Sequence, residues 1–505
     1  MAKNKFYVTT PIYYLNNAPH IGHAYTTLIA DVLSRYNRFK SGEKNVWFLA
    51  GTDEHGAKVA QAAEKTGKTP QEFTDKISEL YKKAWKNLNI SNNDFIRTTE
   101  PRHMEIVEQV LLKLKEAQTP LANHFIYKGN YEGLYCVGCE SYKKESDLVN
   151  GKCPDHDIAP QLLNEENWYL KLSDYAVILK QKISDNELKI LPETRKKEVL
   201  GFIEGGLEDV AISRENVKWG IPIPWDKKQT VYVWVDALIN YISGLGYPKG
   251  KLFKNFWPAD LHVIGKDILK FHTLIWPAML ISLGAELPKA IFIHGYMTIN
   301  GQKMSKTVGN VIDPNNLVAE FGQDAARYLI LSQFPAETDG DVKADDFTVK
   351  YNSDLANGLG NLVSRVVSMD EKYCGSKVPK AKFTANFDLS RLWQTIDANY
   401  EDCKIFENIK EIWKLIQWCD GYIDEKKPWH LAKASKQDEI DQIIYNLLEI
   451  IRHLSWLIDP ILPAAAKNIR DVIGEKDVKF EKAQKINGLK AGTKIGKVEP
   501  LFVRK

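Results

Sequence analysis

Two short polar segments, each placed just after a strand-like apolar run, constrain the fold of this chain more than any other feature. His20-Ile21-Gly22-His23 follows the run at residues 6–10, and Lys303-Met304-Ser305-Lys306-Thr307 follows the run at residues 290–295. Imidazoles near a helix start and ammonium groups on a polar loop both suit phosphate oxygens. One phosphate-bearing substrate can contact both segments only if the fold brings them together. The pair therefore predicts an enzyme whose ATP site has two halves.

The two segments also allow plainer interpretations. Residues 16–19, Asn-Asn-Ala-Pro, predict a helix start, and a helix containing both His20 and His23 places them on one face. They could then donate to phosphate without a full positive charge, while Gly22 leaves room for a flat base. Alternatively, the histidines only cap the helix, and the lysines belong to an ordinary solvated loop.

Alternating apolar runs and helical periodicity predict the fold class. Strands expected at residues 46–50, 231–235, 261–265 and 290–295 favour an α/β fold with a Rossmann-like, doubly wound parallel sheet. After residue 350 the strands give way to long amphipathic helices. We expect residues 1–118 and 229–350 to be two halves of one catalytic domain. Residues 119–228 would be a connective insertion, and residues 351–505 an α-helical bundle ending in a strap.

Composition narrows the range of partners and locations. The chain has 505 residues, a net charge of +3 and 44% hydrophobic residues, so it is an ordinary multidomain globular chain that binds polyanions through local patches. We find no leader-like N-terminal region and no apolar stretch of spanning length. We therefore expect a cytoplasmic protein with no membrane partner.

A cysteine cluster in the expected insertion predicts a metal site. Its spacing is C-x₂-C-x₁₃-C-x₂-H, formed by Cys136, Cys139, Cys153 and His156. Two close ligand pairs separated by a short loop are typical of a tetrahedral zinc knuckle, and four protein ligands make the zinc structural. Asp155 and Asp157 are alternative fourth ligands. We predict one structural Zn²⁺ per chain.

The histidine and lysine segments resemble the two signature motifs of class I aminoacyl-tRNA synthetases, the second ending in Thr307 where serine is usual. Within that class, the chain is similar to the methionyl-tRNA synthetase family over nearly its whole length. The matching stretches are residues 11–14, 50–56, 232–237, 262–268 with 271–272, and 293–296.

The resemblance implies roles for named residues. Catalytic groups would be His20, His23, Lys303 and Lys306, and these would bind ATP together with Gly22, Gly265 and Asp267. Methionine would be held by Ile12, Tyr14, Asp53, Trp234, Ala237, Leu238, Tyr241, Ile268 and His272, with Asp53 on the α-ammonium. Leu238 stands where some relatives have proline. Aromatic walls suit a soft thioether, although Trp234 and Tyr241 would also serve as plain core residues.

The helical region is where a tRNA surface is expected. Asn361 and Arg365 lie four residues apart, and Trp429 follows two lysines. Aromatic, amide and guanidinium groups are those that read single-stranded RNA bases. By resemblance, these three residues read the anticodon, although Trp429 could equally anchor the bundle.

The resemblance therefore implies methionine–tRNA ligase activity. The chain would use ATP with Mg²⁺ to form methionyl-adenylate, and would then transfer the methionyl group to tRNA(Met). The alternatives are a class I synthetase for isoleucine, valine or cysteine, and a catalytically silent tRNA-binding homologue. A monomer is expected.

Overall fold

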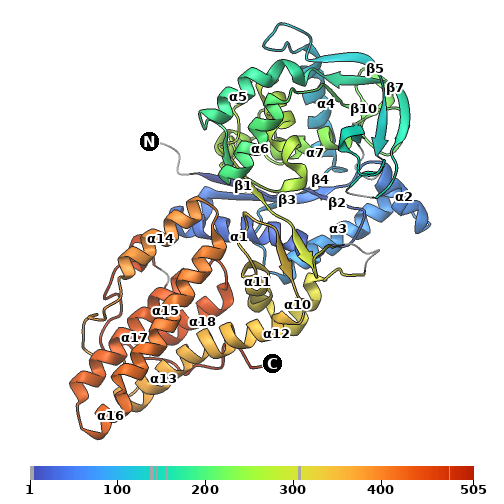
Figure 1. The fold of residues 1–505 in the computed structure, drawn as a ribbon. Coiled ribbons are helices and arrows are strands. Elements are labelled where there is room, and N and C mark those ends of the chain that lie inside the picture. Colours follow the sequence, from blue (N-terminus) through green and yellow to red (C-terminus); the bar gives the residue numbers. More distant parts are fainter. Residues whose placement is uncertain (1–4, 137–140, 144, 155–156, 305–308, 477) are drawn as a thin grey trace.

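The computed structural model describes residues 5–136, 141–143, 145–154, 157–304, 309–476 and 478–505. At its centre is a seven-stranded sheet with the order β2-β3-β1-β13-β14-β8, in which β4 also pairs with β3 (Figure 1). Every pairing in this sheet is parallel. The strands are β1 (Phe6–Thr9), β2 (Tyr13–Tyr14), β3 (Val46–Asp53), β4 (Asp94–Arg97), β8 (Lys189–Leu191), β13 (Leu261–Gly265) and β14 (Ala290–His294).

The sheet is doubly wound, as the sequence predicts. Along β14, Ile291 and Ile293 pack into one hydrophobic cluster, while Phe292 between them packs into another on the opposite face. Such alternation follows from the two-residue period of a strand, and parallel strands need helical crossovers that cover both faces. The helices of this part of the chain are α1 (Ile21–Ser41), α2 (Ala57–Lys65), α3 (Pro70–Asn87), α4 (Pro101–Glu116), α7 (Val233–Ser243), α8 (Lys251–Phe256), α9 (Trp276–Ser282), α10 (Pro314–Phe321) and α11 (Gln323–Leu331).

Sequence-distant halves of the chain meet inside this sheet. β1 lies between β3 and β13, with Val8 opposite Leu261 and Thr9 opposite His262. Both expected halves therefore share one continuous sheet, and the α/β fold with a helical C-terminal region is confirmed.

The segment between the halves forms a four-stranded antiparallel sheet of order β6-β5-β7-β9. It also contributes β8 to the edge of the central sheet, beside β14. Its elements are β5 (Ile126–Cys136), β6 (Ser141–Lys143), β7 (Gln161–Leu170), α5 (Ala176–Ser184), α6 (Glu193–Glu204), β9 (Val210–Ala211), β10 (Ser213–Arg214), β11 (Pro222–Ile223) and β12 (Asp226–Val231).

The prediction of a strand at residues 231–235 is wrong. β12 ends at Val231 and belongs to a small antiparallel sheet with β10 and β11, and α7 begins at Val233. Nearly every residue of α7 is buried, so the helix is covered by protein on all sides. A short apolar run of this kind has no periodicity that separates a buried strand from a buried helix.

The C-terminal region is a bundle of long helices (Figure 1). Its elements are β15 (Met297–Ile299), β16 (Gln302–Lys303) and β17 (Gly340–Val342) at the junction, then α12 (Asp346–Lys350), a π-helix (Tyr351–Gly360), α13 (Asn361–Cys374), α14 (Leu389–Glu401), α15 (Ile405–Lys426), α16 (Pro428–Lys433), α17 (Gln437–Leu457), α18 (Pro463–Ile473) and α19 (Phe480–Ala483). The tail packs back on the body, where Tyr351 donates to the Val503 carbonyl and the Gly488 amide donates to Glu449.

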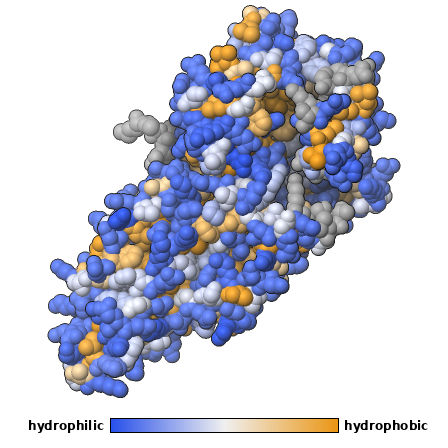
Figure 2. Space-filling view, viewed as in Figure 1, coloured by the Kyte–Doolittle hydropathy of each residue, from blue (hydrophilic) through white to orange (hydrophobic). Residues whose placement is uncertain are grey.

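The visible surface of the bundle is largely hydrophilic, with scattered apolar patches (Figure 2). Across the part of the chain that the structure describes, no helix is long and apolar enough to cross a membrane.

One buried arginine joins the bundle to the catalytic half. Arg327 on α11 forms a 2.7 Å ion pair with Asp31 on α1. It also donates to the carbonyls of Pro460 and Ile461, in the turn between α17 and α18. On the same helix, the Asp324 carboxylate accepts the Ala465 amide in the first turn of α18, at 2.7 Å.

Candidate active site

The histidine segment opens α1. His20 is the N-cap and His23 lies in the first turn, so the helix starts later than residues 16–19 predict. His20 Nδ1 accepts the Gly22 amide at 3.1 Å, and His23 Nδ1 accepts the His20 amide at 3.2 Å. The two rings stack with their centroids 3.8 Å apart. The two histidines therefore cap the start of α1, as the plainer interpretation predicts.

Capping also fixes which ring nitrogen of each histidine can donate a hydrogen bond to phosphate. Because each Nδ1 accepts a backbone amide, each neutral ring carries its proton on Nε2, where it can donate to an oxygen anion. Burial, reinforced by the neighbouring His20, holds the pKa of His23 well below its usual value. His23 is thus a neutral donor at pH 7, as the sequence suggested.

The fold brings the histidine segment to the polar loop. The Ile21 amide, at the start of α1, donates to the Ile312 carbonyl just beyond that loop, at 3.0 Å. A Cβ atom on Gly22 would lie only 2.9 Å from both the Met304 methyl carbon and His20 Cε1. A side chain at position 22 would therefore displace the Met304 methyl group or the His20 ring.

A tight hairpin leads into the loop. β15 pairs antiparallel with β16, and Asn300 and Gly301 between them have φ angles of 51° and 73°. Two positive φ angles are those of a type I′ turn, which Asn-Gly favours. The turn sets Lys303 opposite Thr298. Lys306 lies outside the described residues.

The substrate-pocket candidates gather on α7 and the segment after β13. Ala237, Leu238 and Tyr241 are buried on α7, and Trp234 stacks on Phe271 with ring centroids 4.2 Å apart. Ile12 and Tyr14 are partly buried, and Tyr14 pairs with Asp53, which ends β3 and is 3% exposed.

A fixed proton orientation links two of these residues. The Tyr241 hydroxyl and His272 Nε2 are 2.6 Å apart, and His272 Nδ1 lies 3.0 Å from the Ile268 carbonyl. Burial lowers the pKa of His272 to about 4, so the ring is neutral. A carbonyl can only accept, so Nδ1 carries the proton and Nε2 accepts the Tyr241 hydroxyl proton.

The predicted ribose residues lie at the carboxyl end of β13. Gly265 ends the strand, and an added Cβ there would lie 2.8 Å from the Asp267 carboxylate. On the adjacent strand, His294 Nε2 is 2.8 Å from the Thr26 hydroxyl of α1. The edge of the sheet is thereby tied to the helix that carries His20 and His23.

Sequence reasoning missed several buried polar groups around this site. The Arg214 guanidinium lies 4.0 Å from the centre of the Tyr232 ring and is 7% exposed. Asp236 on α7 is bonded to His55 and His103. Asp236 lies within a stretch used for the family resemblance, and the available signal was a carboxylate in an otherwise apolar run.

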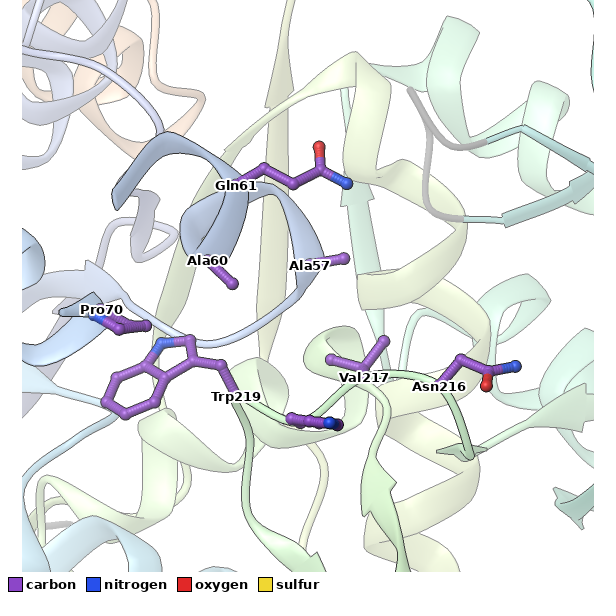
Figure 3. Close-up of a pocket in the computed structure, with 8 residues that line it drawn as sticks. Ala57, Ala60, Gln61, Pro70, Asn216, Val217 and Trp219 are labelled. Atoms are coloured by element: carbon purple, nitrogen blue, oxygen red, sulfur yellow. The ribbon is translucent and has the colours of Figure 1, made fainter. Parts of the chain in front are cut away.

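An open pocket of about 390 Å³ lies beside the segment that follows Asp53 (Figure 3). α2 forms one wall and the loop before β11 forms the other. The lining residues are Ala57, Ala60, Gln61, Pro70, Asn216, Val217, Lys218 and Trp219. Trp219 is bonded to the segment after Asp53: its indole donates to the Glu54 carbonyl at 2.6 Å, and its own carbonyl accepts the Gly56 amide at 2.9 Å.

Two members of the cysteine cluster are described. Cys136 ends β5, Cys153 follows a tight turn closed by Val149 and Lys152, and both cysteines are buried. Cys139 and His156 lie outside the described residues. Asp157 pairs with Lys152 at 3.1 Å, and its side chain is 86% exposed.

The three anticodon candidates lie on the bundle. Asn361 starts α13 and is exposed, and Arg365 lies one turn further along. The Arg365 guanidinium carbon lies 5.8 Å from the Trp429 ring centroid, and the same side chain pairs with Asp424 at 2.8 Å.

A parallel sheet completed from both halves of the chain, with two signature segments meeting at one helix start, defines a class I synthetase domain. The family model for "tRNA synthetases class I (M)" matches residues 6–161 and 145–367. The model for the "anticodon binding domain of methionyl tRNA ligase" matches residues 375–505, which contain Trp429 but not Asn361 or Arg365.

Individual relatives agree. The chain is 44% identical to the methionine–tRNA ligase of Clostridium perfringens, covering 100% of this chain and 78% of that protein. It is 41% identical to the methionine–tRNA ligase of Thermotoga maritima, covering 99% of this chain and 80% of that protein. It is similar to the Mycobacterium tuberculosis methionyl-tRNA synthetase in complex with methionyl-adenylate, with a TM-score of 0.92, 35% identity and coverage of 99% and 100%. The chain belongs to the methionyl-tRNA synthetase family, which confirms the resemblance.

Proposed function

We propose that this chain is a methionine–tRNA ligase. The methionine carboxylate attacks the α-phosphorus of ATP, releasing pyrophosphate, and a hydroxyl of the tRNA terminal ribose then displaces AMP from methionyl-adenylate. The observation that carries the proposal is the meeting of the two signature segments at the start of α1, in a chain of this family. Positioning and charge stabilisation supply most of the catalysis of such phosphoryl chemistry.

In this proposal His20 and His23 donate from Nε2 to phosphate oxygens, and Lys303 and Lys306 neutralise the departing pyrophosphate with Mg²⁺. The two histidines would orient the phosphates, and the two lysines would offset their negative charge. Asp53 receives the substrate ammonium. The test is amino-acid-dependent ATP–pyrophosphate exchange, with isoleucine, valine and cysteine as comparison substrates. Exchange with methionine alone is expected; exchange only with another amino acid, or none at all, would refute the proposal.

The pocket walls suit a thioether. Because the Tyr241 hydroxyl proton is directed to His272, the pocket presents aromatic and aliphatic surface rather than a strong donor. A soft, weakly accepting sulfur tolerates this environment, whereas a hydroxyl or charged side chain does not. The observed orientation thus supports methionine among the apolar substrates.

The cysteine cluster is proposed to hold one structural zinc through Cys136, Cys139, Cys153 and His156. Burial of both described cysteines supports it, and the exposed pairing of Asp157 with Lys152 favours His156 over Asp157 as fourth ligand. The zinc would supply only fold stability. Metal analysis should give one zinc per chain, and active protein without zinc would exclude the site.

The bundle is proposed to read the tRNA anticodon through Asn361, Arg365 and Trp429. Their shared location and partial exposure support the assignment. We further propose a cytoplasmic monomer, which light scattering and cell fractionation would test.

A further inference from the structure

A buried carboxylate lies on the far side of the helix that carries the pocket residues. Asp236 on α7 is 1% exposed. Its Oδ2 atom lies 2.7 Å from His55 Nδ1, and its Oδ1 atom lies 2.7 Å from His103 Nε2. The histidines are themselves 4% and 0% exposed. A carboxylate in such surroundings costs free energy unless it is fully hydrogen-bonded, so an apolar residue would serve simple packing better.

The two histidines come from different parts of the fold. His55 lies two residues beyond Asp53, in the segment that joins β3 to α2. His103 lies in the first turn of α4, and its Nδ1 atom is 2.7 Å from the Ser243 hydroxyl at the end of α7. The carboxylate therefore connects α7 to the Asp53 segment through one oxygen, and to α4 through the other.

The Asp53 segment is held on its other side as well. Trp219 bonds both Glu54 and Gly56 through their backbones. His55 also packs edge-on against the Trp219 ring, with centroids 5.4 Å apart. The segment thus has a rigid backing on one side and the carboxylate of α7 on the other, and the bond to Asp236 fixes its separation from α7.

That separation matters for an amino acid substrate. The α-ammonium and the side chain of methionine are joined by covalent bonds of fixed length, so the Asp53 carboxylate and the α7 pocket wall must stay a matching distance apart. A misplacement of about 1 Å in such a constellation can cost about 100-fold in rate.

We propose that Asp236 is a positioning residue: through His55 it sets the spacing between the ammonium ligand Asp53 and the side-chain pocket on α7, while its bond to His103 only anchors the helix. This inference rests on the proposed function, because it takes Asp53 and α7 as the methionine site. It adds a determinant of amino acid affinity that itself touches no substrate.

The two histidines provide a matched pair of variants, because each contacts the same carboxylate at the same distance. In the full-length protein, His55→Phe should raise the KM for methionine by about 10- to 100-fold in the exchange assay, with the KM for ATP changed less than about 2-fold. His103→Phe should lower the thermal midpoint but keep the KM for methionine within about 3-fold. His55→Gln, which can still donate to the carboxylate, should recover much of the loss.

A ligand without the ammonium group distinguishes a changed distance between Asp53 and α7 from a general loss of pocket structure. Competition by 4-(methylthio)butanoate, which keeps the thioether and carboxylate, should be nearly unchanged in His55→Phe, while methionine affinity falls. Equal loss for both ligands, or equal loss of methionine affinity in the His55 and His103 variants, would overturn the proposal. Should His55→Phe fail to fold, the comparison of His55→Ala with His103→Ala, neither of which can donate to the carboxylate, decides by the same criterion. A wild-type protein inactive with methionine would instead refute the proposed function.

Discussion

The proposed amino acid pocket and the proposed tRNA-reading surface of the bundle differ in how far their charged groups are buried. Around the pocket, Asp236 and its two histidines are almost wholly buried, and each bonds to another element of the fold. On the bundle, Arg365 pairs with Asp424 at the surface, with side chains 30% and 68% exposed. A small substrate needs walls held at fixed distances, whereas a macromolecular partner needs groups that remain accessible. The charged groups near the proposed pocket hold elements of the fold together, whereas Arg365 stays accessible for the proposed contact with tRNA.

The largest expected effect is on stability at a buried ion pair. Arg327→Met should lower the free energy of unfolding by about 3–5 kcal/mol, because it leaves the Asp31 carboxylate buried without this partner. The measurement is denaturant unfolding followed by circular dichroism. Arg365→Met is the control from the exposed end, with an expected cost below about 1 kcal/mol. Similar costs for both variants would mean that the exposed ion pair stabilises the fold as much as the buried one does.

The second largest effect is expected at low pH, where His272 should lower the free energy of unfolding. The pKa of His272 is lowered to about 4 by burial, so the unfolded chain binds a proton at this position that the folded chain does not. Stability should therefore fall as the pH drops from about 6.5 to about 4, by roughly 1.4 kcal/mol for each unit at this group. Denaturant unfolding at pH 7 and pH 5 measures the slope. His272→Gln should flatten it, and an unchanged slope would exclude His272 as a contributor.

At the bundle end, Trp429→Ala should leave methionine-dependent pyrophosphate exchange intact and reduce tRNA charging. Loss of one base-stacking aromatic corresponds to about 1–3 kcal/mol, or roughly 5- to 150-fold in kcat/KM for tRNA. The adjacent exposed residue supplies the control, His430→Ala, for which charging should be normal. Parallel losses of exchange and charging would show that Trp429 anchors the bundle instead.

The smallest effect is expected at the surface ion pair. Asp424→Asn should change the free energy of unfolding by less than about 1 kcal/mol, since exposed pairs are well solvated and screened by salt. Thermal unfolding at low and high salt measures it. A loss of several kcal/mol would mean that this pair is structural, like those near the pocket.

Much of the fold was predictable because local patterns were strong. The strand runs at residues 6–10 and 290–295 and the helical bundle follow from periodicity and apolar content, and the structure confirms them. The segment at 231–235 was not predictable, since only tertiary burial turns an all-apolar run into α7. The edge strand β8 lies inside the expected insertion and is too short to stand out as a sheet member.

The candidate site also has a part that the sequence predicts and a part that depends on the fold. Motif residues such as His20 and Gly22 could be named from sequence, but their role in capping and in packing against Met304 depends on the fold. Asp236 was noticeable only as a carboxylate in a mostly apolar run, and its bonds to His55 and His103 could not be predicted, because both partners are distant from it in the chain. Long-range pairs of this kind carry no local signal.

The joint at Arg327 has a consequence for how the two parts of the molecule can vary. On the bundle side the guanidinium donates to backbone carbonyls, those of Pro460 and Ile461, and Asp324 accepts a backbone amide. Main-chain groups are present whatever the side chains are, so the joint recognises the path of the turn rather than its residues. A bundle exchanged for that of a relative should therefore keep these hydrogen bonds wherever the turn between α17 and α18 keeps its shape.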